Sequence, residues 1–158
     1  MNIPKFRLLF LVLIALVRTA GAEQFLVTMT SDTIAADGLL SLREAVLAAN
    51  ANGMDDTIVL SNEVYTLTIG GSNENACMSG DLDVTETNTL TILGPATIDG
   101  NQLDRVFDVF ANATLVLSDL VITGGQSPIP GPGLLRPHGG GIRASGCRKG
   151  VSPPNSLF

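Results

Sequence analysis

Two aspartates flank a leucine in the stretch Asp81-Leu82-Asp83, and residues i and i+2 of a strand point to the same face. Asp108 lies 25 residues after Asp83, and a valine follows each of them. In stacked strands the two carboxylates would be about 4.8 Å apart, where like charges repel unless water or a cation screens them. Calcium takes several oxygen ligands and is the cation that suits this set. Because the chain has no calcium-loop motif, we interpret these aspartates first as hydrated structural acids and second as a calcium site.

Carboxylate pairs also perform glycoside hydrolysis. The candidates for one outer groove are Asp99, Asp104 and Asp108. Residues 23–125 contain no lysine and no histidine, so a polysaccharide-lyase base would have to be Arg43 or Arg105. We interpret Arg43 as a surface residue of a helix, and the single histidine, His138, lies in an irregular segment without a nucleophile partner. The sequence favours a non-catalytic protein, with a carbohydrate-active enzyme fragment as the alternative.

The charges are segregated along the chain. Residues 23–125 hold all fifteen acids and only two bases, whereas residues 126–158 hold four bases and no acid. Because residues 23–125 are so acidic, they repel the phosphate backbone of a nucleic acid, which argues against nucleic-acid binding. The two cysteines, Cys77 and Cys147, lack the spacing of a metal site, and whether they pair stays open.

The elements that would position these acids follow a repeated pattern. Thr66-Leu67-Thr68-Ile69, Thr89-Leu90-Thr91-Ile92 and Thr114-Leu115-Val116-Leu117 begin 23 and then 25 residues apart and alternate polar with apolar residues. Such a period predicts stacked strands. In that stack Leu67, Leu90 and Leu115 form one inward column, and Ile69, Ile92 and Leu117 form another. The strands expected are Phe25–Met29, Thr57–Leu60, Tyr65–Ile69, Leu82–Val84, Thr89–Leu93, Ala96–Ile98, Val106–Val109, Thr114–Leu117 and Leu120–Thr123.

One helix is predicted at about residues 42–50. Ser41 and Glu44 have the spacing of a capping box, and Asn50, Asn52 and Gly53 supply a stop. The apolar stripe of this helix consists of Leu42, Ala45, Val46 and Ala49. It needs a surface to cover, and the open end of the strand stack offers one.

Residues 1–22 have the features of an export signal. Lys5 and Arg7 precede an apolar run over residues 8–17, and Ala20-Gly21-Ala22 is a small-x-small cleavage site. The alternative is an uncleaved membrane anchor. No second apolar segment of membrane length follows, so we expect a secreted or surface-associated protein.

The ordered series Ser41-Leu42-Arg43-Glu44-Ala45, Thr57-Ile58-Val59-Leu60 and Gly80-Asp81-Leu82-Asp83-Val84 resembles the CSLREA-type domain of bacterial exported β-helix proteins. The resemblance extends from about Phe25 to Ile142 and departs from the family at Leu40, where the motif has cysteine. It implies a polymorphic outer-membrane or adhesin-like protein whose partner is a host or environmental glycan or a surface protein.

The fold we predict is all-β: a right-handed parallel β-helix of about three coils with an N-terminal capping α-helix. The domains are a signal peptide (1–22), a β-helix domain (23–125) and an irregular Gly/Pro-rich tail (126–158), which we interpret as a truncated or frame-shifted end in preference to a natural cap. The function expected is a non-catalytic, adhesin-like exported scaffold with no cofactor, and a calcium ion at the aspartates is the alternative. A third interpretation is a non-functional fragment of a longer surface protein. The open end of the strand stack also predicts self-association.

Overall fold

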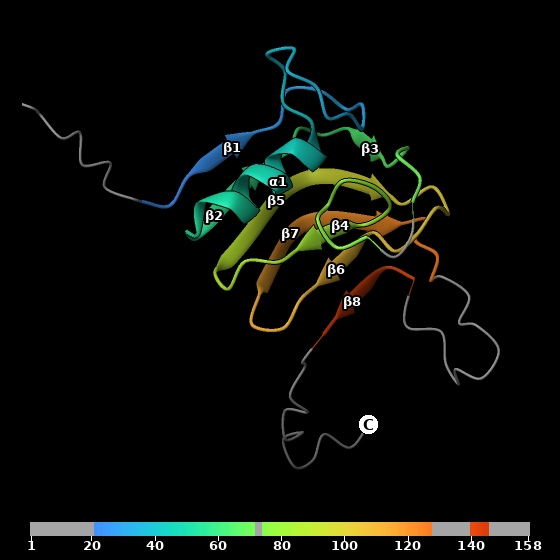
Figure 1. Cartoon of the computed structure of the whole chain (residues 1–158). Helices are drawn as coiled ribbons and strands as arrows, with labels where there is room; N and C mark the ends of the chain where they lie inside the picture. The colour runs from blue at the N-terminus through green and yellow to red at the C-terminus, as the bar shows by residue number, and fades with distance from the viewer. Residues whose placement is uncertain (1–20, 72–73, 128–139, 146–158) are drawn as a thin grey trace, which may run out of the picture.

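The computed structural model describes residues 21–71, 74–127 and 140–145. In these residues eight strands and one helix form two parallel sheets with the helix beside them (Figure 1). The larger sheet contains β1 (Gln24–Leu26), β2 (Asp56–Val59), β5 (Thr89–Asp99), β3 (Val64–Thr66) and β7 (Thr114–Thr123). The smaller sheet has the order β4 (Leu82–Val84), β6 (Phe107–Val109) and β8 (Ile142–Ala144).

The prediction of an all-β parallel β-helix is wrong. The two sheets and the helix α1 (Leu42–Asn52) do not close into a solenoid, and the arrangement is of α/β type with parallel sheets. Ladder pairing joins each strand only to strands of its own sheet. The smaller sheet consists of three-residue strands, and all their ladder partners lie within that sheet. A repeat in sequence predicts parallel stacking, but closure depends on the loops between strands, which do not repeat.

The parallel register between the second and third copies of the pattern is confirmed. Leu90 pairs with Leu115, Ile92 with Leu117 and Ile98 with Ile122 along β5 and β7, and Val84 pairs with Val109 along β4 and β6. Each of β5 and β7 is one continuous strand where two were expected.

The first copy was aligned wrongly. Ile58 of β2 lies beside Ile92, whereas Tyr65 of β3 lies beside Ile98, so Leu67 and Ile69 do not join the predicted columns. The segment Asp56–Val59, which lacks the Thr-Leu-x-Ile pattern, therefore occupies the place assigned to the first copy. Alternation alone does not distinguish these two neighbouring strands, because both present apolar residues to the same core.

Helix α1 is confirmed with its capping box. The Ser41 hydroxyl accepts a hydrogen bond from the Glu44 N–H at 3.1 Å, and the Glu44 carboxylate accepts one from the Ser41 N–H at 2.8 Å. Gly53 ends the helix in the left-handed conformation, with φ 69°. The predicted stripe is buried, and α1 contacts both β4 and β2. The helix therefore packs against one strand of each sheet.

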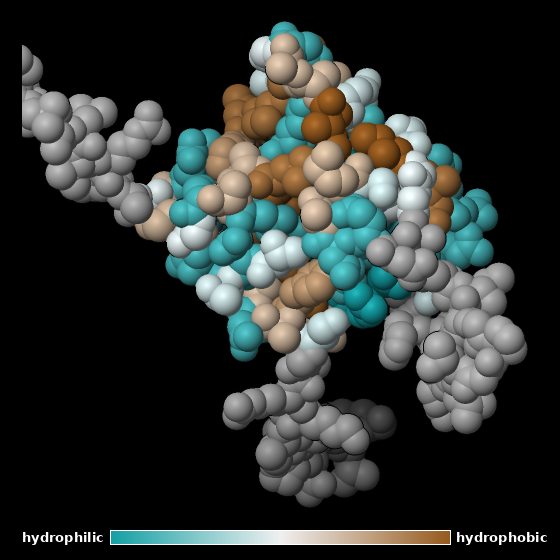
Figure 2. All heavy atoms as spheres, in the orientation of Figure 1, coloured by the Kyte–Doolittle hydropathy of each residue, from teal (hydrophilic) through white to brown (hydrophobic). Residues whose placement is uncertain are grey.

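The apolar core lies between the two sheets and α1, and its members come from all three. The largest fully buried apolar side chains are Ile58, Leu82, Ile92, Ile98 and Phe107. Burying each one contributes roughly 1.5–3 kcal/mol as an upper bound. On the face shown in Figure 2, exposed apolar atoms gather mainly in the upper half of the view.

Strand β7 forms an edge of the larger sheet within the part of the chain that the structure describes. It pairs only with β5 along its ten residues, and its inward residues Leu115, Leu117, Leu120 and Ile122 are only partly buried. Strand β8 extends the smaller sheet beyond Gly125, within the segment 126–158 where the pattern predicted no strand.

Candidate functional site

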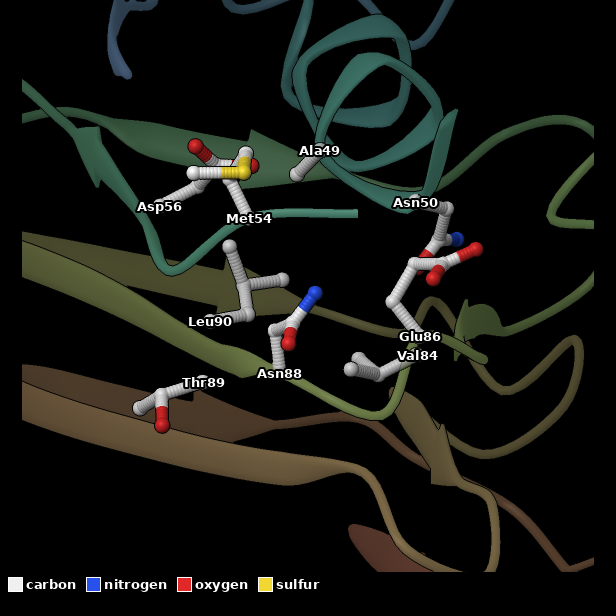
Figure 3. A pocket seen from close by; sticks show the side chains of 9 residues that line it. All are labelled: Ala49, Asn50, Met54, Asp56, Val84, Glu86, Asn88, Thr89 and Leu90. Carbon is white, nitrogen blue, oxygen red and sulfur yellow. The ribbon is translucent and has the colours of Figure 1, made fainter. Parts of the chain in front are cut away.

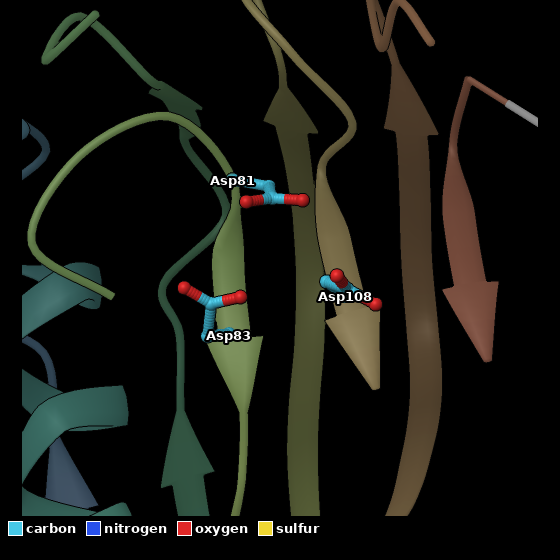
Figure 4. A group of neighbouring side chains, drawn as sticks. All are labelled: Asp81, Asp83 and Asp108. Carbon is cyan, nitrogen blue, oxygen red and sulfur yellow. The ribbon is translucent and has the colours of Figure 1, made fainter. Parts of the chain in front are cut away.

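Asp81, Asp83 and Asp108 form one buried cluster. Asp83 of β4 lies in register with Asp108 of β6, as predicted, and Asp81 immediately precedes β4. One carboxylate oxygen from each lies within 4.8 Å of the other two (Figure 4). The expectation that these acids are hydrated is wrong, because their exposed fractions are 2%, 0% and 1%.

A loop covers the cluster on one side. The N–H of Cys77 donates a hydrogen bond to Asp83 Oδ2 at 2.8 Å. Glu74 holds the same loop in shape, because its carboxylate accepts hydrogen bonds from the N–H groups of Met78 and Ser79 at 2.8 and 2.9 Å. Sequence reasoning missed this cover because a polar loop gives no periodic signal.

Two arginines approach the cluster from the smaller sheet. Arg105 Nε donates to Asp81 Oδ2 at 3.0 Å, and its guanidinium also lies 3.7 Å from both Asp104 and Asp108. Arg143 of β8 is the next residue in the column that begins with Asp83 and Asp108, and it forms a bidentate ion pair with Asp108. Across β4, β6 and β8 the residues in register are therefore Asp83, Asp108 and Arg143.

Arg43 is a second correction. It was expected on the surface of the helix, but its side chain is fully buried. The guanidinium donates to both oxygens of Asp32 at 2.7 and 3.1 Å. It also donates to three backbone carbonyls at the end of the covering loop, those of Cys77, Gly80 and Asp81. Its partners at the loop lie 34 to 38 residues away in sequence, so no local pattern reveals them.

Asp32 is a structural residue that sequence reasoning missed. Besides the pair with Arg43, its Oδ2 accepts hydrogen bonds from the N–H groups of Thr68 and Ile69 at 2.8 and 3.0 Å. Burial raises the pKa of Asp32, but these donors outweigh it and hold the pKa below its ordinary value. Arg43 and Asp32 thus form an electrically neutral unit beside the aspartate cluster.

The electrostatics of the cluster are unfavourable without a further positive charge. Burial, aided by the charges of Asp81, Glu74 and Asp108, raises the pKa of Asp83 to about 7, against the hydrogen bond from Cys77. Burial and the neighbouring Asp104 raise the pKa of Asp81 to about 6. Asp83 Oδ1 is buried and has no hydrogen-bond partner in the structure. Buried acceptors of this kind are rare and need an explanation.

The alternative catalytic set is not brought together. Asp104 and Asp108 both contact Arg105, but Asp99 belongs to β5 in the other sheet, where its carboxylate accepts a hydrogen bond from the Asn101 N–H. Each arginine considered as a lyase base, Arg43 or Arg105, is engaged with carboxylates.

Of the two cysteines and the single histidine, only Cys77 lies in the described part of the chain. Cys77 is a buried free thiol, and burial raises its pKa to about 12, so it is inert as a thiolate source. Cys147 and His138 lie outside the described residues. The structure therefore leaves the question of a cysteine pair untested.

A small cavity lies where α1 meets β4 and β5 (Figure 3). Its volume is about 10 Å³, which is room for at most one water molecule. Asn50 on its rim joins α1 to β4 by donating from Nδ2 to the Asp83 carbonyl at 2.7 Å and accepting from the Thr85 N–H. This cavity is a packing gap and not a ligand site.

Two adjoining open grooves lie beside the edge strand β3. Their volumes are about 470 and 420 Å³, and both are bordered by Thr30 and Ser31. Hydroxyl groups dominate the lining of the two grooves: Thr28, Thr30, Ser31, Thr33, Ser61, Tyr65, Thr66 and Thr68. The lining also contains two carboxylates, those of Glu63 and Asp32. The charge of Asp32 is neutralised by Arg43. Such a lining suits a neutral ligand with many hydroxyl groups.

Comparison with protein-family models, curated proteins and solved structures returned no match for this chain. The resemblance to the CSLREA-type domain therefore stays a prediction. No helix in residues 21–71, 74–127 and 140–145 has the length and apolar character needed to cross a membrane.

Proposed function

We propose that this protein is a non-catalytic, adhesin-like exported scaffold that binds a glycan in the grooves beside β3. The observation that carries the proposal is the hydroxyl lining of these grooves. Their volumes fall within the range of about 300–1,000 Å³ found for ligand sites. Ser31, in the segment before α1, and Thr66 of β3 both line the second groove.

The interpretation as a non-catalytic scaffold also accounts for the buried aspartates. The carboxylates that could serve hydrolysis, Asp104 and Asp108, are buried and ion-paired with arginine. A general acid must reach the leaving-group oxygen of its substrate. Charges enclosed in this way instead tie the covering loop and the smaller sheet together.

Glycan binding is tested with the purified full chain on a panel of soluble neutral and acidic polysaccharides. We expect saturable binding that weakens at least about tenfold in Ser31→Val and Thr66→Val, because each loses a hydroxyl that the ligand needs. Thr114→Val makes the same chemical change at the exposed start of β7, at the opposite end of that strand from the row that Thr66 shares with Asp99 and Thr123, and should bind as the original chain does. Absence of binding to every polysaccharide would refute the proposal.

The enzyme reading is tested in the same samples. Polysaccharide incubated with the chain, with and without calcium, should keep its length. Release of shortened products, above all calcium-dependent release, would show a carbohydrate-active enzyme instead. Export is tested by fractionating cells that express the chain with residues 1–22 intact, and retention in the cytoplasm would count against the exported assignment.

Self-association is the partner interaction that the scaffold makes available. Within the described residues, the outer edge of β7 has no ladder partner along its ten residues, and Val121 of this strand is 58% exposed. Unprotected strand edges pair with one another, and a charged residue blocks such pairing. We expect concentration-dependent dimers in size-exclusion chromatography that Val121→Lys abolishes. A monomer at all concentrations would contradict this expectation.

A further inference from the structure

We propose that Asp81, Asp83 and Asp108 bind a calcium ion in the interior of the protein, between the smaller sheet and its covering loop. This inference is independent of glycan binding. Two observations carry it together. Three carboxylate oxygens converge within 4.8 Å, and the buried Asp83 Oδ1 has no hydrogen-bond partner. In Figure 4 one oxygen of Asp83 points toward the space that it shares with Asp81 and Asp108.

The separation of the oxygens is compatible with calcium. Calcium has ligand oxygens at about 2.3–2.6 Å, so oxygens on opposite sides of it lie up to about 5 Å apart. Magnesium has them at about 2.0–2.1 Å, which limits the same separation to about 4.2 Å. The oxygens of this set lie within 4.8 Å of one another, a separation that calcium accommodates, whereas magnesium also demands near-ideal octahedral geometry from its ligands.

The charge balance points to a divalent ion. Four carboxylates, those of the three aspartates and Asp104, face two guanidiniums, those of Arg105 and Arg143. The group therefore carries a formal charge of −2, since Arg43 is neutralised by Asp32. Uncompensated buried charge is costly, and one divalent cation neutralises this excess.

The bound ion would fasten parts of the chain that no local structure connects. Asp83 already holds the loop through the Cys77 N–H, and Asp108 holds β8 through Arg143. Three protein ligands are fewer than the six to eight that calcium takes. The second oxygens of these aspartates already accept hydrogen bonds from Cys77, Arg105 and Arg143, so water must complete the shell. We therefore expect the modest affinity of extracellular calcium modules, with a Kd of about 10⁻⁴–10⁻³ M.

The test is thermal unfolding of the purified full chain in chelator and in about 10 mM calcium. Preferential binding to the folded state should raise Tm by about 5 °C. Asp83→Asn should abolish this rise, because it removes the unpartnered carboxylate. Asp119→Asn removes one charge from an exposed turn of β7 and should keep the full rise.

Isothermal titration of the original chain with calcium and with magnesium completes the design. It does not depend on whether Asp83→Asn folds. Saturable calcium binding that magnesium does not reproduce supports the proposal. No calcium binding, equal binding of magnesium, or an undiminished Tm rise in Asp83→Asn would each overturn it. None of these outcomes depends on glycan binding, so this proposal and the proposed function can fail separately.

Discussion

Replacing Arg43 by methionine should destabilise the protein more than any other change of a charged residue described here. The substitution keeps much of the length of the side chain but removes five hydrogen bonds, two to Asp32 and one each to the carbonyls of Cys77, Gly80 and Asp81. Asp32 would remain buried and ionised with only two backbone donors.

The magnitude follows from leaving a buried charge without its partner, which costs about 3–5 kcal/mol. The five hydrogen bonds are not additive, because water entering the gap satisfies some of the carbonyls. A domain of this size is stable by about 5–15 kcal/mol, so the loss is a large share of the total. With a urea dependence of about 2 kcal/mol per molar, we expect the unfolding midpoint to fall by about 2 M.

The assay is equilibrium unfolding in urea, followed by circular dichroism. Asp119→Asn is the control, because it removes a charge from an exposed position in β7, and we expect a change of at most about 0.5 kcal/mol. Adding Asp32→Asn to Arg43→Met should restore at least about 1 kcal/mol, since it removes the stranded charge. A loss for Arg43→Met as small as that for Asp119→Asn would refute the reasoning.

Three further predictions concern stability and use the same urea assay. Ser41→Ala removes the N-cap acceptor and should cost about 1 kcal/mol, and an unchanged midpoint would show that the capping box is dispensable. Gly125→Ala should cost about 2 kcal/mol, because the new methyl would collide with the carbonyl oxygen of Gly140, and a neutral result would mean that the backbone there yields easily. In chelator, stability should fall as pH rises from about 4 to about 7. The folded-state pKa of Asp83 is raised from 3.8 to about 7, so the folded state binds more protons than the unfolded one throughout that window. Asp83→Asn should flatten this profile, and an equally steep profile in the variant would assign the effect to other groups.

Local signals in the sequence were sufficient for several elements. The capping box of Ser41 and Glu44, the stop at Gly53 and the buried stripe of α1 all occur as predicted. The spacing of 25 residues placed Asp83 beside Asp108 and Leu90 beside Leu115. These features depend on residues a few positions apart or on a repeated period, so they can be recognised in the sequence alone.

The burial of the aspartates was not accessible in this way. Whether Asp83 is hydrated or enclosed depends on a loop whose position is held by Cys77 and by the carbonyls that Arg43 binds. The contacts of Arg43 join segments more than thirty residues apart, and the contact of Cys77 belongs to an irregular loop. Irregular segments have no period, so a pattern analysis treats them as solvent-facing by default.

The Asp81-Leu82-Asp83 stretch separates what the sequence determines from what only the tertiary structure decides. The sequence by itself determined that its two carboxylates share one face of a strand and that a stacked strand adds Asp108, because side-chain direction in a strand follows a period of two. Only the tertiary structure decided that this face is covered and that one carboxylate oxygen has no partner. It also decided that the sheets do not close into a solenoid. The physical reason is that burial and closure depend on long-range contacts through loops, and their energies appear only when distant segments meet.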